Sequence, residues 1–259
     1  ISNWNFRKDK TLNFAMLFLN TIKLETFLEP TWGSIKINNM NQAFKNTGIS
    51  SLNLSSWDVS ETFDLSSTFE GTTMTSLDLS NWQLTKGSND VDLNGMFKNS
   101  TINDLDVSGW NTSGVDTITS MFEGFKTTDL DLSHFDVRDV DVNFAKRVFY
   151  DAQISGTLNI SNWNLANLEA MESANWLDYT VLNFFGGENI SLNTLIVRNW
   201  DNQYEFNMKL GDVGDRVSTF WSQSLLPPNR PNIICSSSKF QFFGNGCTQS
   251  STNTVGPGL

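Results

Sequence analysis

Short alternations of apolar and polar residues recur along this chain, and each is followed closely by an aromatic residue. Residues 52–54 (Leu-Asn-Leu) and 77–79 (Leu-Asp-Leu) show the period of two that is typical of a short strand with one buried face. Farther along, segments such as residues 61–69 carry apolar side chains three or four positions apart, which predicts one or two turns of helix. Gly, Asn, Ser or Thr then turn the chain back toward the next strand.

Two series of aromatic residues mark this repeat. We call the residue after each strand the first anchor; the first anchors are Trp4, Trp32, Trp57, Trp82, Trp110, Phe135, Trp163 and Trp200, with spacings of 28, 25, 25, 28, 25, 28 and 37 residues. The second anchors lie nearer the predicted helix, at Phe18, Phe44, Phe69, Phe97, Phe122, Phe149 and Trp176. The extra residues of the longer units fall between first and second anchor, and the last gap is predicted to hold an insertion around residues 183–189.

A unit of about 25 residues cannot bury its apolar face alone, but stacked units can. The repeat therefore predicts an α/β solenoid of about eight leucine-rich-repeat-like coils of 25–28 residues, each with one short parallel strand and one short helix. Equivalent residues stack in such a fold, so both anchor series are predicted to be aromatic columns of the core.

These units resemble the BspA-like leucine-rich repeats of bacterial and protist surface proteins. The best copies are SLDLSNW with LNGMF (residues 76–82 and 93–97), DLDVSGWNTSGVDTITSMF (104–122) and SLNLSSWDVSETFDLSSTF (51–69). Phe135 stands where the pattern has Trp, and the coils around residues 43–44 and 148–149 lack its Met. The resemblance covers roughly residues 1–205 and implies an adhesive module, extracellular or at the cell surface, with no enzymatic activity.

The chain after the repeats is predicted to differ from them. We expect a solenoid over residues 1–205, a C-terminal cap over 206–248 and a flexible tail or linker over 249–259. Cys235 and Cys247 are the only cysteines, and they either form a disulfide that closes the cap or remain two free thiols. The resemblance to surface proteins favours the disulfide. Because the chain starts inside a repeat and ends in a tail, we expect a fragment of a longer surface protein.

Composition excludes several classes of partner and chemistry. The chain has 259 residues and a net charge of −11, which disfavours nucleic acid and anionic membranes, and it has no apolar run long enough to span a bilayer. No nucleophile elbow, zinc-protease helix or phosphate-binding loop occurs. The single histidine, His134, occupies a repeat position held elsewhere by Ser, Asn or Gly, so it is predicted to be a surface variant. We expect no cofactor, with calcium as the one candidate ion.

One polar position in each strand is the candidate ligand-facing site. It lies between the two apolar strand residues and is held by Asn53, Asp78, Asp106, Asp131 and Asn159. The three stacked carboxylates of Asp78, Asp106 and Asp131 would repel one another, and a hard cation such as Ca²⁺ could relieve this repulsion. Alternatively, they are solvated surface charges.

The chain also contains five Asn-x-Ser/Thr triplets. If it passes through a eukaryotic secretory pathway, Asn99 and Asn111 are the better glycan acceptors, whereas Asn53, Asn159 and Asn189 are weaker candidates. If the chain is bacterial, none of the five triplets is expected to carry a glycan.

The predicted function is adhesion or recognition of a protein or glycan through the strand face. The alternative is a structural subunit of a surface layer, filament or virion, which would self-associate. A remote third option is a carbohydrate-active enzyme, which would lose hydrolysis on mutation of Asp106 or Asp131.

Overall fold

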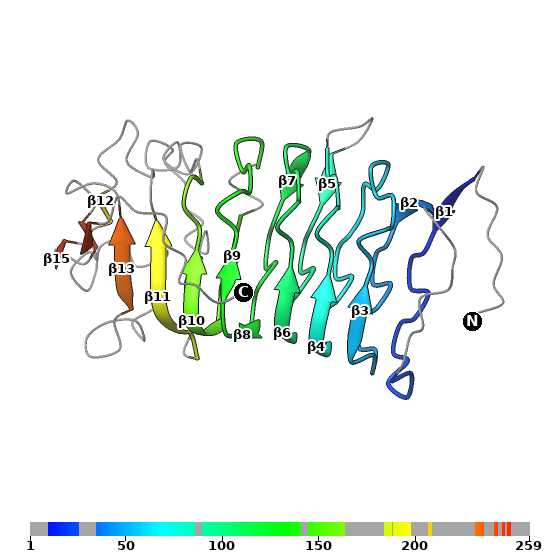
Figure 1. Ribbon diagram of the computed structural model, residues 1–259, viewed down its shortest axis with the longest axis horizontal. Coiled ribbons are helices and arrows are strands. Elements are labelled where there is room, and N and C mark those ends of the chain that lie inside the picture. The colour runs from blue at the N-terminus through cyan, green and yellow to red at the C-terminus, as the bar shows by residue number, and fades with distance from the viewer. Residues whose placement is uncertain are drawn as a thin grey trace, which may run out of the picture.

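The backbone forms a long parallel sheet of short strands, one strand or strand pair per coil (Figure 1). This computed structural model describes residues 10–25, 35–85, 90–140, 145–163, 184–187, 189–197, 207–208, 231–235, 241–242, 245–246 and 248–249. The main sheet has the strand order β16-β13-β11-β10-β8-β6-β4-β3, and β9 also pairs with β10. Its strands are β3 (Ser51–Asn53), β4 (Thr73–Asp78), β6 (Thr101–Asp106), β8 (Lys126–Thr127), β9 (Leu130–Asp131), β10 (Gln153–Asn159), β11 (Ser191–Val197), β13 (Asn232–Cys235) and β16 (Thr248–Gln249).

Shorter ladders lie on other sides of the coils. Strands β1 (Thr11–Asn13) and β2 (Lys36–Asn39) pair in parallel, as do β5 (Val91–Asp92) and β7 (Val115–Thr117). Near the C-terminus, β14 (Gln241–Phe242) pairs with β12 (Asn207–Met208) and with β15 (Asn245–Gly246). The main ladder is in register from coil to coil, with Leu52 beside Leu77 and Leu77 beside Leu105. The strands predicted from the alternating pattern, and their parallel stacking, are therefore confirmed.

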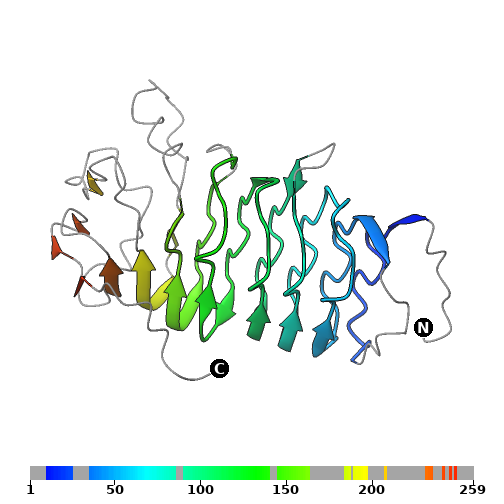
Figure 2. The same cartoon turned by 45° about the horizontal axis from the view of Figure 1, so that its top comes forward.

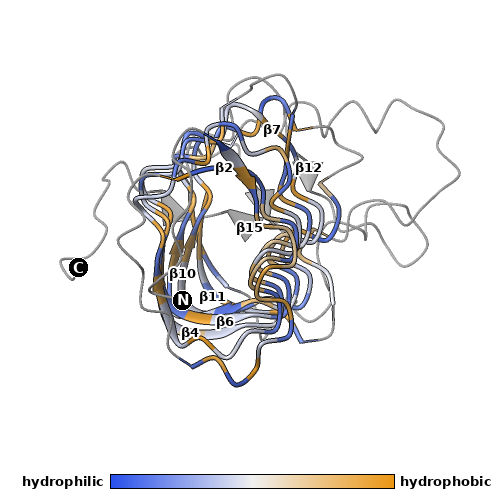
Figure 3. Cartoon of the chain, turned by 90° about the vertical axis from the view of Figure 1, so that its right-hand side faces the viewer, coloured by the Kyte–Doolittle hydropathy of each residue, from blue (hydrophilic) through white to orange (hydrophobic). Residues whose placement is uncertain are grey.

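The coils enclose a single apolar core, and in the end-on view the apolar positions recur at the same places in successive coils (Figure 3). The second anchors from Phe18 to Phe149 form one continuous stack, with neighbouring ring centroids 5.2–5.7 Å apart. A first-anchor stack runs through Trp82, Trp110, Phe135 and Trp163, with centroids 5.5–6.3 Å apart. Both anchor columns lie in the core over these residues. Trp57 packs edge-on against Phe14, and Trp4, Trp32 and Trp200 lie outside the described residues.

The first-anchor tryptophans also fasten each coil to the preceding one. The indole Nε1–H of Trp82 donates to the carbonyl oxygen of Leu54 at 2.9 Å, and that of Trp110 donates to Leu79 at 2.8 Å. Trp163 donates in the same way to Leu132. Since a buried indole N–H needs an acceptor, this bond explains how Trp fits the core without leaving a polar group unpaired.

The prediction of one short helix per coil is wrong for the described coils, which contain no helix. The second-anchor segments are runs of overlapping turns, as residues 93–100 illustrate. Lys98 N–H donates to the carbonyl three residues back, but Phe97 and Asn99 donate to carbonyls of the following coil at 2.9 and 2.7 Å. An α-helix would direct all of these N–H groups along its own axis, so it cannot form alongside this ladder. Two apolar residues per turn still face the core. Their positions explain why the sequence shows apolar residues three or four positions apart without a helix.

Left-handed residues close these turns. In each second-anchor segment, the residue two positions after the anchor has φ between 54° and 95°, a conformation that favours Gly, Asn and Asp. The residues at this position are Asn20, Asn46, Gly71, Asn99, Gly124, Asp151 and Gly187. This position could have identified the turns from the sequence.

Phe185 continues the second-anchor stack, so the prediction that Trp176 does so is wrong. The ring of Phe185 lies 5.2 Å from that of Phe149 with an interplanar angle of 9°. Trp176 itself lies outside the described residues. Residues 183–189 therefore contain the anchor rather than the insertion, and the extra length falls between first and second anchor, as in the other long units.

The main sheet continues past residue 205, into the segment predicted to be a cap. Strand β13 pairs with β11, and β16 pairs with β13, both in parallel. Cys235 ends β13, whereas Cys247 lies outside the described residues. Of the predicted tail over 249–259, Gln249 ends β16 and residues 250–259 lie outside the described residues. Ile233 is buried, so the core extends into this region.

Candidate functional site

The outward face of the main sheet runs along the coils, and no other described element lies over it (Figure 2). The predicted ligand-facing residues lie side by side on it: Asn53 pairs with Asp78, Asp78 with Asp106, and Asp131 with Asn159. Asn53, Asp106 and Asp131 are exposed and Asp78 is half-buried, but Asn159 is only 9% exposed. Four of the five are therefore accessible to a partner.

These side chains also have a structural task. In all five, Oδ1 accepts a hydrogen bond from the backbone N–H two residues later, which forms an Asx turn that ends the strand. Asn53 Nδ2 additionally donates to Asp78 Oδ2 at 2.9 Å. Because Asp and Asn can both accept this bond, either residue can form the turn. The choice between them therefore sets only the charge of the face.

Two further aspartates enlarge the acidic part of this face. Asp104 lies on β6 two residues before Asp106, and Asp129 lies two residues before Asp131; both are exposed. Asp129 Oδ1 accepts the backbone N–H of Thr157 at 2.7 Å, next to the irregular register of β10. The sequence analysis missed both because it considered only the position between the two apolar strand residues.

The central strands thus carry a patch that we call the acidic face, made of Asp78, Asp104, Asp106, Asp129 and Asp131. Among the described strands of the main sheet, only β8 carries a cationic residue, the exposed Lys126. No aromatic side chain is exposed at the described outward positions of these strands. Within the described residues, no three carboxylate, imidazole or thiol groups come together closely enough to hold a metal ion, and this includes the three aspartates considered for calcium.

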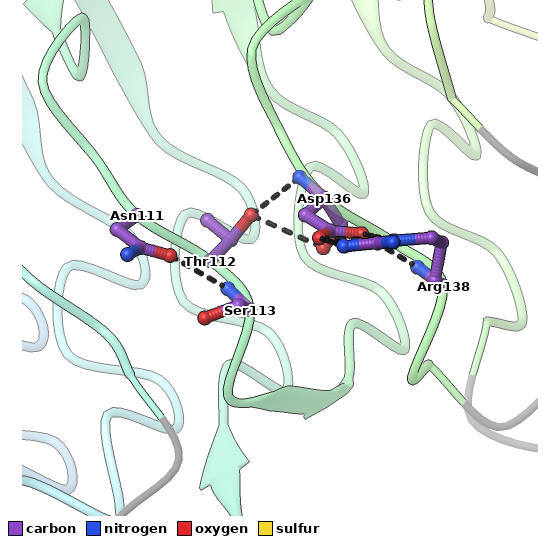
Figure 4. A network of polar contacts seen from close by, with 5 residues as sticks. All are labelled: Asn111, Thr112, Ser113, Asp136 and Arg138. Atoms are coloured by element: carbon purple, nitrogen blue, oxygen red, sulfur yellow. Dashed lines mark hydrogen bonds and ion pairs between the residues drawn. The ribbon is translucent and has the colours of Figure 1, made fainter.

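A second series of polar turns follows the first anchors (Figure 4). Asn111 Oδ1 accepts from Ser113 N–H at 3.1 Å, and Asp136 Oδ1 accepts from Arg138 N–H at 3.2 Å. Thr112 Oγ1 joins the two coils, because it accepts from Asp136 N–H at 2.7 Å and donates to the Asp136 carbonyl at 3.1 Å. The Arg138 guanidinium also binds the Asp136 carboxylate, which lowers the pKa of Asp136. These contacts tie Thr112, Asp136 and Arg138 to one another within the fold.

A second group of aspartates lies on another side of the coils and contains Asp64, Asp92 and Asp116. Burial raises the pKa of Asp92, and the nearby charges of Asp64 and Asp116 raise it further, although a hydrogen bond from Asn94 N–H acts in the opposite direction. Asp64 and Asp92 are bridge partners in adjacent coils and both cap Asx turns. This group is part of the turn framework and faces no described cavity.

His134 has a definite role, which its prediction as a surface variant did not include. Its Nε2 lies 2.7 Å from the carbonyl oxygen of Val107, and since a carbonyl only accepts, Nε2 carries the proton. In the neighbouring coils the corresponding carbonyl accepts from a first-anchor indole, but here the anchor is Phe135, which has no N–H. His134 therefore supplies the donor that the change from Trp to Phe removes.

The five glycan-acceptor candidates differ in accessibility. Asn99, Asn111, Asn53 and Asn189 are exposed, whereas Asn159 is buried and its Oδ1 accepts from Ser161. The predicted disulfide depends on Cys247, outside the described residues. Among the residues that the structure describes, no helix has the length and apolarity to cross a membrane.

Comparison with known proteins identifies a family but no activity. Residues 1–101 and 86–176 match the family described as "Mycoplasma protein of unknown function, DUF285", and the two matches together span more than half of the chain. No curated protein and no solved structure matches the chain.

Proposed function

The chain belongs to the DUF285 family, and from this membership and the geometry of the sheet we propose that it is a non-catalytic recognition module that binds a cationic protein partner at a cell surface. The observation that carries the proposal is the outward sheet face, which presents exposed polar side chains in register from coil to coil. The resemblance of the repeats to BspA-like surface proteins supports the extracellular location.

The composition of the face favours a protein over a glycan. Sugar-binding platforms commonly use exposed aromatic rings, and the described outward positions of the central strands have none. The acidic face instead complements Lys and Arg side chains, and opposite charges raise the rate and selectivity of association. The carboxylates of Asp78, Asp106 and Asp131 are engaged in Asx turns, which supports a binding role without catalysis.

A pair of charge variants tests this proposal. Asp104→Asn with Asp106→Asn removes two charges from the acidic face and keeps the Oδ1 acceptor that the Asp106 turn needs. Asp58→Asn with Asp139→Asn makes the same change in net charge on the turns after the first anchors, and the Asn at 58 keeps the bond from Ser60. The probes are immobilised Lys- and Arg-rich peptides, matched Glu-rich peptides and a glycan array.

We expect the parent chain and the Asp58/Asp139 variant to bind the basic peptides with equal affinity and the Asp104/Asp106 variant to bind them more weakly. Binding should also weaken with added salt. Equal binding by both variants would refute the role of the acidic face, and binding to glycans alone would replace the protein partner with a sugar.

A structural role through self-association is the second candidate. The first described coil exposes Met16 by 51% and Ile22 by 71%, which are large values for apolar side chains. Contact with another copy would bury them. Sedimentation at increasing concentration distinguishes the two roles, because a recognition module stays monomeric and a structural subunit forms larger species that Ile22→Ser abolishes.

A further inference from the structure

The second-anchor turns carry two tripeptides that alternate along the stack. Phe-Lys-Asn occurs at residues 44–46 and 97–99, and Phe-Glu-Gly occurs at residues 69–71 and 122–124. Backbone hydrogen bonds join every turn to the turn of the following coil, within a pair and between pairs alike, so the pairing is carried by the side chains. We infer that the repeating unit of this solenoid is a pair of coils, not the single coil.

Ion pairs form within these pairs. Lys45 Nζ lies 2.8 Å from Glu70 Oε2, and Lys98 Nζ lies 3.2 Å from Glu123 Oε1. Between the first two pairs, the contacts of the described residues include no ion pair of Glu70 with Lys98, whereas Glu123 Oε1 also lies 2.9 Å from the Arg147 guanidinium, across the next boundary. Glu70 and Glu123 are largely buried, at 19% and 11% side-chain exposure, so solvent screens these contacts less than fully exposed pairs.

The Asn and Gly positions interlock in the same pairs. Asn46 Oδ1 lies 2.2 Å from the place that a Cβ on Gly71 would occupy, and Asn99 Oδ1 lies 2.3 Å from the corresponding place on Gly124. The side chain of the first coil thus fills the space that the glycine of the second coil leaves open. Both glycines have positive φ, at 70° and 66°, so Gly serves the turn as well as the packing.

A third pair follows the same rule despite its longer spacing. Asp151 Oδ1 lies 2.0 Å from the place of a Cβ on Gly187 and accepts the backbone N–H of Asn189 at 2.8 Å. The residues inserted between these two coils leave the interlock intact.

The outward face of the sheet repeats in the same two-coil blocks. One row of strand positions has the same residue in both coils of a pair and a different residue in the next pair. When each turn is grouped with the strand that follows it along the chain, the row reads Ser51 and Ser76, then Asp104 and Asp129, then Thr157 and Thr194. Pairing therefore extends from the turns to the surface, and the acidic face is centred on one block.

Duplication of coils tests the inference. A second copy of residues 45–97 inserted after Phe97 adds two coils and keeps the alternation. Two further copies of residues 45–69 inserted after Phe69 also add two coils, but they place three Phe-Lys-Asn turns in succession. We expect the first variant to melt in one transition at or above the parent temperature, and the second to melt on the order of 4 °C below the first.

A two-residue rescue makes the test specific. Lys→Glu and Asn→Gly in the middle one of the three successive Phe-Lys-Asn turns restores the alternation, and it should recover most of the lost melting temperature. Equal melting of the two duplications, or a rescue without effect, would overturn the two-coil unit.

The parent chain offers an independent measurement that requires no added coils. Double-mutant cycles on Lys45 with Glu70 and on Lys98 with Glu123, with Ala at each position, should show coupling of about two- to fivefold in the unfolding equilibrium constant. The cycle on Glu70 with Lys98 should be additive. Equal coupling in all three cycles would contradict the pairing.

Discussion

The exchange of roles between His134 and Phe135 gives the sharpest test of how the coils are fastened. His134→Asn installs the residue found at the equivalent positions Asn81 and Asn162 and removes the Nε2 donor from the Val107 carbonyl. The Val107 carbonyl also accepts from the backbone N–H of Trp110 at 3.1 Å, so it keeps one partner in the variant. The lost hydrogen bond should therefore cost about 0.5–1.5 kcal/mol.

The loss of the imidazole ring adds a second contribution. The ring packs edge-on against Phe135 with centroids 5.1 Å apart, and aromatic pairs of this kind contribute about 0.5–1.5 kcal/mol. His134→Asn should therefore cost roughly 1–3 kcal/mol in all. His134→Phe keeps a ring but lacks the donor, so comparison of the two variants separates the hydrogen bond from the packing.

Phe135→Trp should rescue His134→Asn. An indole at position 135 would donate to Val107 as Trp82, Trp110 and Trp163 donate to their carbonyls, at 2.8–2.9 Å. In the parent background the same substitution adds a donor that competes with His134, so its benefit should be small. The expected coupling is about 1 kcal/mol, measured by urea unfolding of the parent, both single variants and the double variant. If His134→Asn costs the same with Phe or Trp at position 135, the two residues do not share this task.

Three further predictions concern the core, the turns and the buried acid. Trp110→Ala should lower the free energy of unfolding by roughly 3–5 kcal/mol, measured in urea, because it removes a buried ring stacked on both sides. Gly124→Ala should lower it by about 1–3 kcal/mol because of the positive φ and the Asn99 oxygen at the Cβ place, and a loss equal to that of an exposed Gly→Ala change would refute the interlock. Asp92→Asn should stabilise the chain at pH 7 while its Oδ1 still caps Asn94. Since the pKa of Asp92 is raised in the folded state, the parent loses stability as the pH rises from the ordinary carboxyl range through the raised pKa. The stability gained by Asp92→Asn should therefore vanish in acid, where the Asp92 carboxyl of the parent is protonated. A gain that does not depend on pH would contradict this reasoning.

The sequence predicted the strands and the stacking but not the geometry of the turns. The period of two around residues 52–54 and 77–79 has one physical meaning, a half-buried strand, and the structure confirms it. The spacing of three and four around the second anchors has two possible physical meanings, a helix or a run of overlapping turns, because both place apolar residues on one side. Hydrogen bonds to the next coil decide between them, and these depend on neighbours that a local pattern does not contain.

The candidate site shows the same division. The alignment of its residues in a column follows from the repeat, as the pairing of Asp78 with Asp106 shows. The burial of Asn159 and the contribution of Asp129 depend on the irregular register of β10, which no repeat pattern predicts. Phe185 was misassigned because the longer unit hides its offset, although Gly187 two residues later carries the turn signal.

The turn ladders give the molecule an electrical direction. In the second-anchor segments every second N–H group donates to the following coil, as Phe18 does to Ala43 near one end and Phe149 does to Phe184 near the other. The peptide dipoles of these segments therefore align along the solenoid axis, with the positive end toward the C-terminal coils, the reverse of the polarity of an α-helix. An anionic group is accordingly favoured at the C-terminal end of this ladder and a cationic group at its N-terminal end, so the two ends of the rod are chemically distinct even where their side chains are alike.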